Sequence, residues 1–281
     1  MSVPDFILIG AMKCGTSTLA AQLGAQTGIF MADPKEPNYF SDDAVFARGA
    51  DWYASLFDGA EAGEIRGEAS THYTKRPDFP LTLSRMTDAA PDVRLIYMIR
   101  DPLARLVSHY LHGWSKAGYS GSLGAALDSD NTLVDYGRYG WQIEPYLDAY
   151  GAETILLTSL ERLKSNPAGE LARIAAHIGH GHGVTWHEDL AAENVSAARA
   201  RRLPLHGLLI ANPVAAALRR TLVPKSIRTR IRNSRKMAMR PEIPADRIAG
   251  LKALFAADRD VLAKHFPDDP SLDLAYPWHT P

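Results

Sequence analysis

The sequence predicts an α/β protein with a central parallel sheet flanked by helices on both faces. Three apolar runs, residues 6–10, 94–99 and 154–158, have the length and composition of buried strands. Helical patterns follow them, and strands that alternate with helices are typical of a mainly parallel sheet. Because such sheets bind ligands beyond the carboxyl ends of their strands, the residues just after each strand are the first candidates for a site.

Glycine and proline residues mark where the predicted helices and strands begin and end. The first strand ends in a glycine, and Gly28 lies just past the helix that follows it. Pro91 closes a later helix, and Pro102 opens the next one at the position where proline costs least. After strand 6–10 we expect helix 17–26, strand 64–68, helix 79–90, strand 94–99, a helix from 102, strand 154–158, helix 167–178 and helix 244–266.

Composition limits the class of protein. The chain has 281 residues, 46% of them apolar and 22% charged, which is typical of a soluble globular protein. A net charge of −1 argues against a general nucleic-acid binder. Its single cysteine excludes an intrachain disulfide and a cysteine-based zinc site, and suits a reducing compartment. No run approaches the roughly 18 apolar residues of a membrane span, and Asp5 and Lys13 bound the first apolar run, so we expect a cytoplasmic protein.

The loop after the first strand, residues 10–18, has the composition of an anion site. Gly15, Thr16 and Ser17 place backbone N–H groups at a helix N-terminus, and Lys13 adds a positive charge. A nucleotide-triphosphate loop would carry its lysine directly after the second glycine, where this chain has Thr16. No apolar strand ends in an evident magnesium-binding aspartate. The loop therefore predicts an anion site without a metal; the alternative is an ordinary tight turn with a capping serine.

A second candidate loop follows strand 94–99. Arg100 stands at the carboxyl end of that strand, and Arg105, Ser108 and His112 share one face of the next helix, opposite its apolar stripe. An arginine fork with a hydroxyl suits a phosphate monoester. The alternative is an arginine that caps the sheet edge beside a solvated helix face.

Together the two loops resemble those of the sulfotransferases that use 3′-phosphoadenosine 5′-phosphosulfate (PAPS). The first is similar to their 5′-phosphosulfate loop, most of all in the heparan-sulfate and bacterial branch. Residues 100–110 match the 3′-phosphate pattern Arg-x-Pro-x-x-Arg-x-x-Ser-x-Tyr at every fixed position. Weaker matches follow the family's order at residues 35–40, 51–53, 67–70 and 159–163. The resemblance implies one sulfotransferase domain, 1–281, with a P-loop-like fold.

The resemblance also implies an activity. A sulfuryl group would pass from PAPS, without a metal, to a hydroxyl or amine of a glycan or small metabolite, leaving adenosine 3′,5′-bisphosphate (PAP). Lys13 would neutralise the charge that builds on the leaving group, and Arg100 and Ser108 would hold the 3′-phosphate. The 5′ end would be held by Lys13, Cys14, Gly15, Thr16, Ser17 and Thr18. The alternatives are a nucleotide or sugar kinase with an atypical phosphate loop, and a non-catalytic nucleotide sensor.

Glu36 is the first candidate for the base that takes the acceptor's proton. It matches the glutamate of the Lys-Glu-x-x-Phe/Tyr-Phe pattern in the glycan branch; the alternative is a surface pair with Lys35. His72 is the rival, because other branches use histidine. His109 and His112 are expected to pack or to contact phosphate.

Two further predictions concern side chains that other chemistry would use. The Cys14 thiol would have a lowered pKa if it faced the loop amides, but a small filler is expected. No metal site is expected among the later histidines, His177, His180, His182 and His187.

The segment 181–243 matches the family poorly and is strongly basic. Residues 194–241 hold 12 lysines and arginines and no acidic residue. We favour a lid over the active site, with Arg235 and Lys236 at the donor; acceptor recognition is another role open to the segment 181–243. The alternatives are solvated arginines and, for the apolar stretch 205–222 with its basic ends, an anionic membrane surface.

Overall fold

The computed structural model describes residues 4–191 and 239–279. Most of the basic segment, with Arg235 and Lys236, lies outside the described residues. The fold is built on a sheet of parallel strands in the order β2-β3-β1-β4-β5, which confirms the predicted class. The strands are β1 Phe6–Gly10, β2 Ile29–Met31, β3 Ile65–Ala69, β4 Arg94–Ile99 and β5 Ile155–Ser159.

β1 lies in the middle of the sheet and carries the first candidate loop. It pairs with β3 on one side and with β4 on the other, so that Phe6 aligns with both Gly67 and Arg94. All five β1 residues are buried, because helices cover both faces of the sheet. The loops that follow β1, β3 and β4 therefore emerge side by side at one edge, where ligands of parallel sheets bind.

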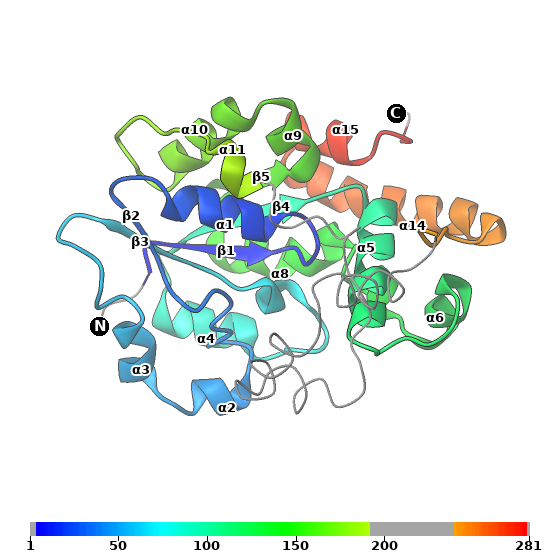
Figure 1. Cartoon of the computed structure of the whole chain (residues 1–281), viewed down its shortest axis with the longest axis horizontal. Helices are drawn as coiled ribbons and strands as arrows, with labels where there is room; N and C mark the ends of the chain where they lie inside the picture. The colour runs from blue at the N-terminus through cyan, green and yellow to red at the C-terminus, as the bar shows by residue number, and fades with distance from the viewer. Residues whose placement is uncertain (1–3, 192–238, 280–281) are drawn as a thin grey trace, which may run out of the picture.

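The helices form a layer on each face of the sheet (Figure 1). α1 lies over one face with α10 and α11, and α4 and α8 lie over the other. The helices are α1 Thr16–Gly24, α2 Asp43–Phe46, α3 Ala50–Ser55, α4 Thr82–Ala89, α5 Pro102–Ser115, α6 Leu123–Ser129, α7 Thr132–Asp135, α8 Tyr139–Tyr150, α9 Leu160–Ser165, α10 Pro167–His177, α11 Glu188–Ala191, α14 Ala245–His265 and α15 Ser271–Ala275. Two short 3₁₀ turns are η1 Thr71–Thr74 and η2 Ala152–Thr154.

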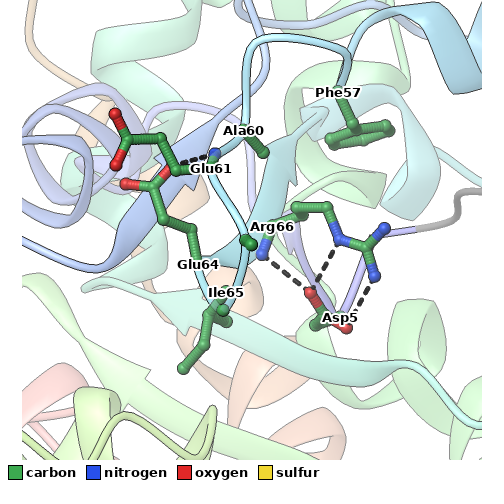
Figure 2. A pocket seen from close by; sticks show the side chains of 9 residues that line it. Asp5, Phe57, Ala60, Glu61, Glu64, Ile65 and Arg66 are labelled. Carbon is green, nitrogen blue, oxygen red and sulfur yellow. Dashed lines mark hydrogen bonds and ion pairs between the residues drawn. The ribbon is translucent and has the colours of Figure 1, made fainter.

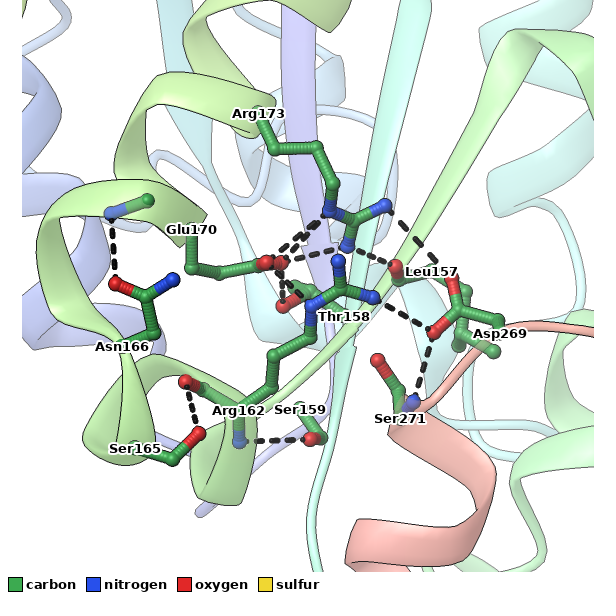
Figure 3. Close-up of polar contacts among 11 residues, drawn as sticks. Leu157, Thr158, Ser159, Arg162, Ser165, Asn166, Glu170, Arg173, Asp269 and Ser271 are labelled. Atoms are coloured by element: carbon green, nitrogen blue, oxygen red, sulfur yellow. Dashed lines mark hydrogen bonds and ion pairs between the residues drawn. The ribbon is translucent and has the colours of Figure 1, made fainter.

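A buried charge network fastens the C-terminal part of the chain to the β5 edge (Figure 3). Glu170 is only 2% exposed, and its carboxylate pairs with Arg162 and Arg173, each at 2.5 Å. The Thr158 hydroxyl donates a third hydrogen bond to it at 2.6 Å. Asp269, just before α15, contacts the same two guanidinium groups. This network fixes α9, α10 and α15 around β5.

None of the described helices combines the length and apolar character that crossing a bilayer requires.

Candidate functional site

The loop after β1 has the geometry of an anion site. Gly15 caps α1 with φ +100°, a conformation that side chains disfavour, and an added Cβ would lie 2.8 Å from the Leu160 side chain. The hydrogen-bond ladder of α1 begins with the Thr18 N–H, which donates to the Gly15 carbonyl at 3.0 Å. The N–H groups of residues 15–17 stand ahead of that ladder, as the first amides of a helix do, and are placed to bind an anion.

The Cys14 side chain packs beneath this loop, and its thiol donates to the Met12 carbonyl at 3.8 Å. This side chain is fully buried, with Sγ 3.3 Å from the Tyr139 hydroxyl. Burial raises the pKa of the thiol to about 11. The side chain is therefore an inert filler beneath the loop, and the alternative of a lowered pKa is wrong.

Arg100 brings the second loop against the first. It follows β4, which is hydrogen-bonded to β1, and its Nη1 donates to the Lys13 carbonyl at 3.3 Å. The next residue, Asp101, caps α5 by accepting the Leu103 N–H at 2.9 Å, and its own N–H donates to Glu161 at 3.2 Å. Glu161, from the weakly matching 159–163 stretch, thus holds the second loop in place.

Arg105 and Ser108 on the polar face of α5 are buried and His112 is half-buried, so the alternative of a solvated helix face is wrong. Arg105 is 0% exposed; it donates to the Leu133 carbonyl and lies 3.4 Å from His109 Nδ1. Ser108 is 3% exposed. His109 stacks on Tyr136, which confirms a packing role, and burial beside Arg105 lowers its pKa to about 3. Most of the polar face of α5 therefore packs inside the protein and supports the loop that follows β4.

Glu36 lies beside the start of η1, the turn that follows β3. Its N–H donates to the Ala69 carbonyl at 2.9 Å, and its Oε1 accepts from Lys35 Nζ at 3.0 Å and from the Thr71 hydroxyl at 3.1 Å. Burial opposes ionisation, but Lys35 and Thr71 outweigh it and hold the pKa of Glu36 below its usual range. The ion pair between Lys35 and Glu36 is thus present, and the hydrogen bond from Thr71 to Glu36 holds this pair beside η1.

His72 lies on the same turn but has a different environment. Its ring stacks on Phe79, and its Nδ1 is buried without a hydrogen-bond partner in the described part of the chain. Burial and the nearby charge of Lys75 lower its pKa to about 4. His72 is therefore neutral at pH 7, with one ring nitrogen enclosed.

Two residues that sequence reasoning left without a role stand out in the structure. Glu68 is fully buried and accepts hydrogen bonds from Tyr53 and Tyr73 at 2.8 Å and from Ser70 at 2.7 Å; burial raises its pKa. Its motif match at 67–70 was a signal that it matters. Lys75, only 9% exposed directly after η1, gave no sequence signal.

A cavity of about 640 Å³ lies at the opposite end of the sheet (Figure 2). Asp5, Arg66, Glu61 and Glu64 line it, next to the starts of β1 and β3. Asp5 pairs with Arg66 at 3.1 Å, which leaves two acidic side chains in the lining. An anionic donor would be repelled here, so the cavity does not compete with the loop edge as its site.

Metal ligation finds no support in the later histidines. The His180 and His182 rings meet edge to face at 5.5 Å, and His177 Nε2 lies 3.1 Å from the Leu95 carbonyl oxygen. In residues 4–191 and 239–279, no three His, Cys, Asp or Glu side chains are grouped so that they could hold a metal ion.

Comparison with known proteins agrees with this geometry. The family model of the sulfotransferase domain matches residues 3–202. The chain is 30% identical over 186 residues to heparan sulfate glucosamine 3-O-sulfotransferase 3B1 of Mus musculus, covering 63% of this chain and 46% of that protein. It is 29% identical over 191 residues to heparan sulfate glucosamine 3-O-sulfotransferase 6 of Homo sapiens, covering 65% and 54% respectively. The chain thus spans about half the length of these curated relatives.

A solved structure shares the fold. The sulfotransferase from Alicyclobacillus acidocaldarius superposes with a TM-score of 0.66 at 24% identity, over 96% of this chain and 98% of that one.

Proposed function

Since this chain belongs to the sulfotransferase domain family, we propose that it transfers a sulfuryl group from PAPS to a hydroxyl or amine of a glycan or small metabolite. One observation carries the proposal. The hydrogen bond from Arg100 to the Lys13 carbonyl joins two separate anion loops at one sheet edge. A donor with phosphate groups at both its 5′ and its 3′ end needs two such loops side by side.

The residues present fit this donor. The amides of residues 15–17 and the Lys13 ammonium suit the 5′-phosphosulfate, and Arg100 suits the 3′-phosphate, with the Ser108 hydroxyl, only 3% exposed, expected beside it. When bound, PAPS supplies the sulfuryl group and leaves as PAP.

In the proposed reaction, Glu36 takes the acceptor's proton as the acceptor oxygen or nitrogen forms its bond to sulfur. The bond between sulfur and the bridging oxygen of the donor breaks in line, and Lys13 neutralises the charge left on that oxygen. A carboxyl with the ordinary pKa of 4.5 is ionised at neutral pH, and the lowered pKa of Glu36 leaves it ionised and able to accept a proton. Thr71 and Lys35 both bind Oε1, and in the described residues Oε2 has no hydrogen-bond partner.

A glycan acceptor is the part of the proposal that rests on relatives. The curated relatives are named as heparan sulfate glucosamine 3-O-sulfotransferases, and Glu36 stands in the pattern that resembles their branch. The kinase alternative is disfavoured, because Thr16 stands where a nucleotide-triphosphate loop has lysine and Arg100 follows β4 where that class often has a carboxylate.

The test first measures the melting temperature of the protein with and without nucleotide, and then the transfer of a labelled sulfuryl group. PAP without magnesium should raise the melting temperature, whereas adenosine 5′-phosphate alone should raise it much less. Labelled PAPS should then pass label to members of a panel of glycans, phenols and lipids. Stabilisation by magnesium-ATP but not by PAP would contradict the proposal and favour the kinase.

A further inference from the structure

Lys75 is a buried cation at the edge of the site. Its side chain follows η1, and only 9% of the residue is exposed. The preceding Thr74 hydroxyl donates to the Ile9 carbonyl at 3.0 Å, which pins this turn beside the start of the first anion loop. Lys75 Nζ lies 5.6 Å from the centre of the Tyr136 ring. Lys75 therefore directly follows the turn whose first residue, Thr71, donates a hydrogen bond to the proposed base, Glu36.

No carboxylate of the described residues forms an ion pair with it. Glu36 and Asp78 are the acidic groups whose negative charge acts to raise the pKa of Lys75. Glu36 is bound by Lys35 and Thr71, and Asp78 accepts the Tyr136 hydroxyl. Beyond the described residues, Glu193 is the sole acidic side chain that the sequence contains.

Burying an ammonium without a counter-ion is costly, because burial weakens its hydration and no opposite charge compensates for the loss. That cost lowers the pKa of Lys75 to about 8, even though Glu36 acts to raise it. Such a group is retained more readily where a ligand supplies the missing negative charge. The donor's two anionic ends are already matched by the two anion loops, so the acceptor is the remaining source.

We propose that Lys75 binds an oxyanion of the acceptor, a carboxylate or a sulfate ester, and so holds the attacking hydroxyl or amine against Glu36. Lys75 then selects anionic acceptors over neutral ones of the same shape. This inference rests on the proposed function, because it assumes that an acceptor binds beside Glu36.

The first experiment measures binding without turnover. A disaccharide carrying a uronic acid, its uncharged methyl ester and a 2-O-sulfated disaccharide are each titrated calorimetrically into PAP-loaded protein. The wild type should bind a charged sugar more tightly than the ester. Lys75→Met should weaken that binding roughly 10- to 100-fold and leave the ester unchanged, as expected for a lost charged hydrogen bond. Which charged sugar shows the loss identifies the oxyanion.

Controls separate this role from a structural one. Lys75→Met should melt at the same temperature as the wild type or higher, because it removes an unpaired buried charge. Lys75→Arg should keep the preference for the charged sugar. Lys164→Met, which removes an exposed lysine on α9, should change nothing.

Three results would overturn the inference. They are an equal loss of affinity for charged and neutral sugars, a melting temperature lowered by several degrees in Lys75→Met, and wild-type binding that ignores charge. Failure of the wild type to bind PAP would instead contradict the proposed function. The two failures are therefore distinguishable.

Discussion

Replacing Glu36 with glutamine tests the proposed chemistry at its centre. Glutamine keeps the shape of the side chain and an oxygen that can accept the Thr71 hydroxyl, but it cannot take a proton from the acceptor. Loss of a general base costs about a hundred- to ten-thousandfold in rate. At 1.36 kcal/mol for each tenfold, that is about 2.7–5.4 kcal/mol of transition-state stabilisation. The loss should appear in kcat, with PAP affinity unchanged.

The pH dependence gives a second signature of Glu36. A base works in its deprotonated form, and Lys35 and Thr71 outweigh burial to hold the pKa of this carboxyl below its ordinary value of 4.5. Wild-type activity should therefore be present above that ordinary value and be lost as pH falls through the lowered pKa. Glu36→Gln should lack this acidic limb.

The assay is transfer of labelled sulfuryl groups across a pH series, with Glu61→Gln as the control. Glu61 is an exposed carboxylate at the far end of the sheet, so its variant should match the wild type in rate and profile. If Glu36→Gln stays within threefold of the wild type, or if His72→Ala removes the acidic limb instead, the assignment of the base is wrong.

Three further predictions follow from the loops and the core. Lys13→Ala should lower kcat about a hundred- to a thousandfold and lower it more than PAP affinity, because charge develops on the leaving oxygen only during transfer; an unchanged kcat would remove Lys13 from the chemistry. Arg100→Ala should abolish most of the thermal shift with PAP, worth roughly 2.7 kcal/mol at a hundred times the dissociation constant, while the ligand-free protein stays folded. Glu170→Ala removes the more deeply buried of the two carboxylates that Arg162 and Arg173 share, leaving Asp269, and should destabilise the fold by about 3–5 kcal/mol, or about 6–12 °C in melting temperature. The exposed Glu144→Ala is the matched control, and a shift as small as its own would contradict the account.

The sheet was predictable because its strands are buried on both faces. Continuous apolar runs placed β1 and β4 at the bounds that the structure shows, and β5 begins and ends one residue later than expected. The three residues of β2 are too few for a periodic signal. Helix ends were less certain: α4 begins at Thr82 rather than at residue 79, because the Thr82 hydroxyl donates to the Phe79 carbonyl and holds the intervening residues in a turn.

α8 was missed because its local signals oppose a helix. Pro145 lies inside it, and Gly140 lies in its first turn, both of which lower helix propensity. Tertiary contacts override this preference. Asp258 of α14 accepts the N–H groups of Gly140 and Trp141 at 2.8 and 2.9 Å, and Tyr139 and Tyr146 are buried beneath the sheet. A cap that comes from a helix more than a hundred residues away has no sequence signature.

The candidate site shows a different limit, because a motif does not separate the residues that hold a ligand from those that hold the loop. Arg100 and Arg105 occupy equivalent fixed positions of one pattern, yet Arg100 faces the first loop and Arg105 is 0% exposed beneath the second. Lys75 shows the converse, since no pattern includes it, and only the three-dimensional structure shows that it is buried without a carboxylate partner among the described residues. A site of this kind therefore has two layers, in which ligand-facing charges such as Lys13 and Arg100 keep their geometry because buried polar groups fix the backbone that carries them. Substitution of a supporting residue such as Arg105 should consequently lower donor affinity and stability together, whereas loss of a ligand-facing charge separates the two.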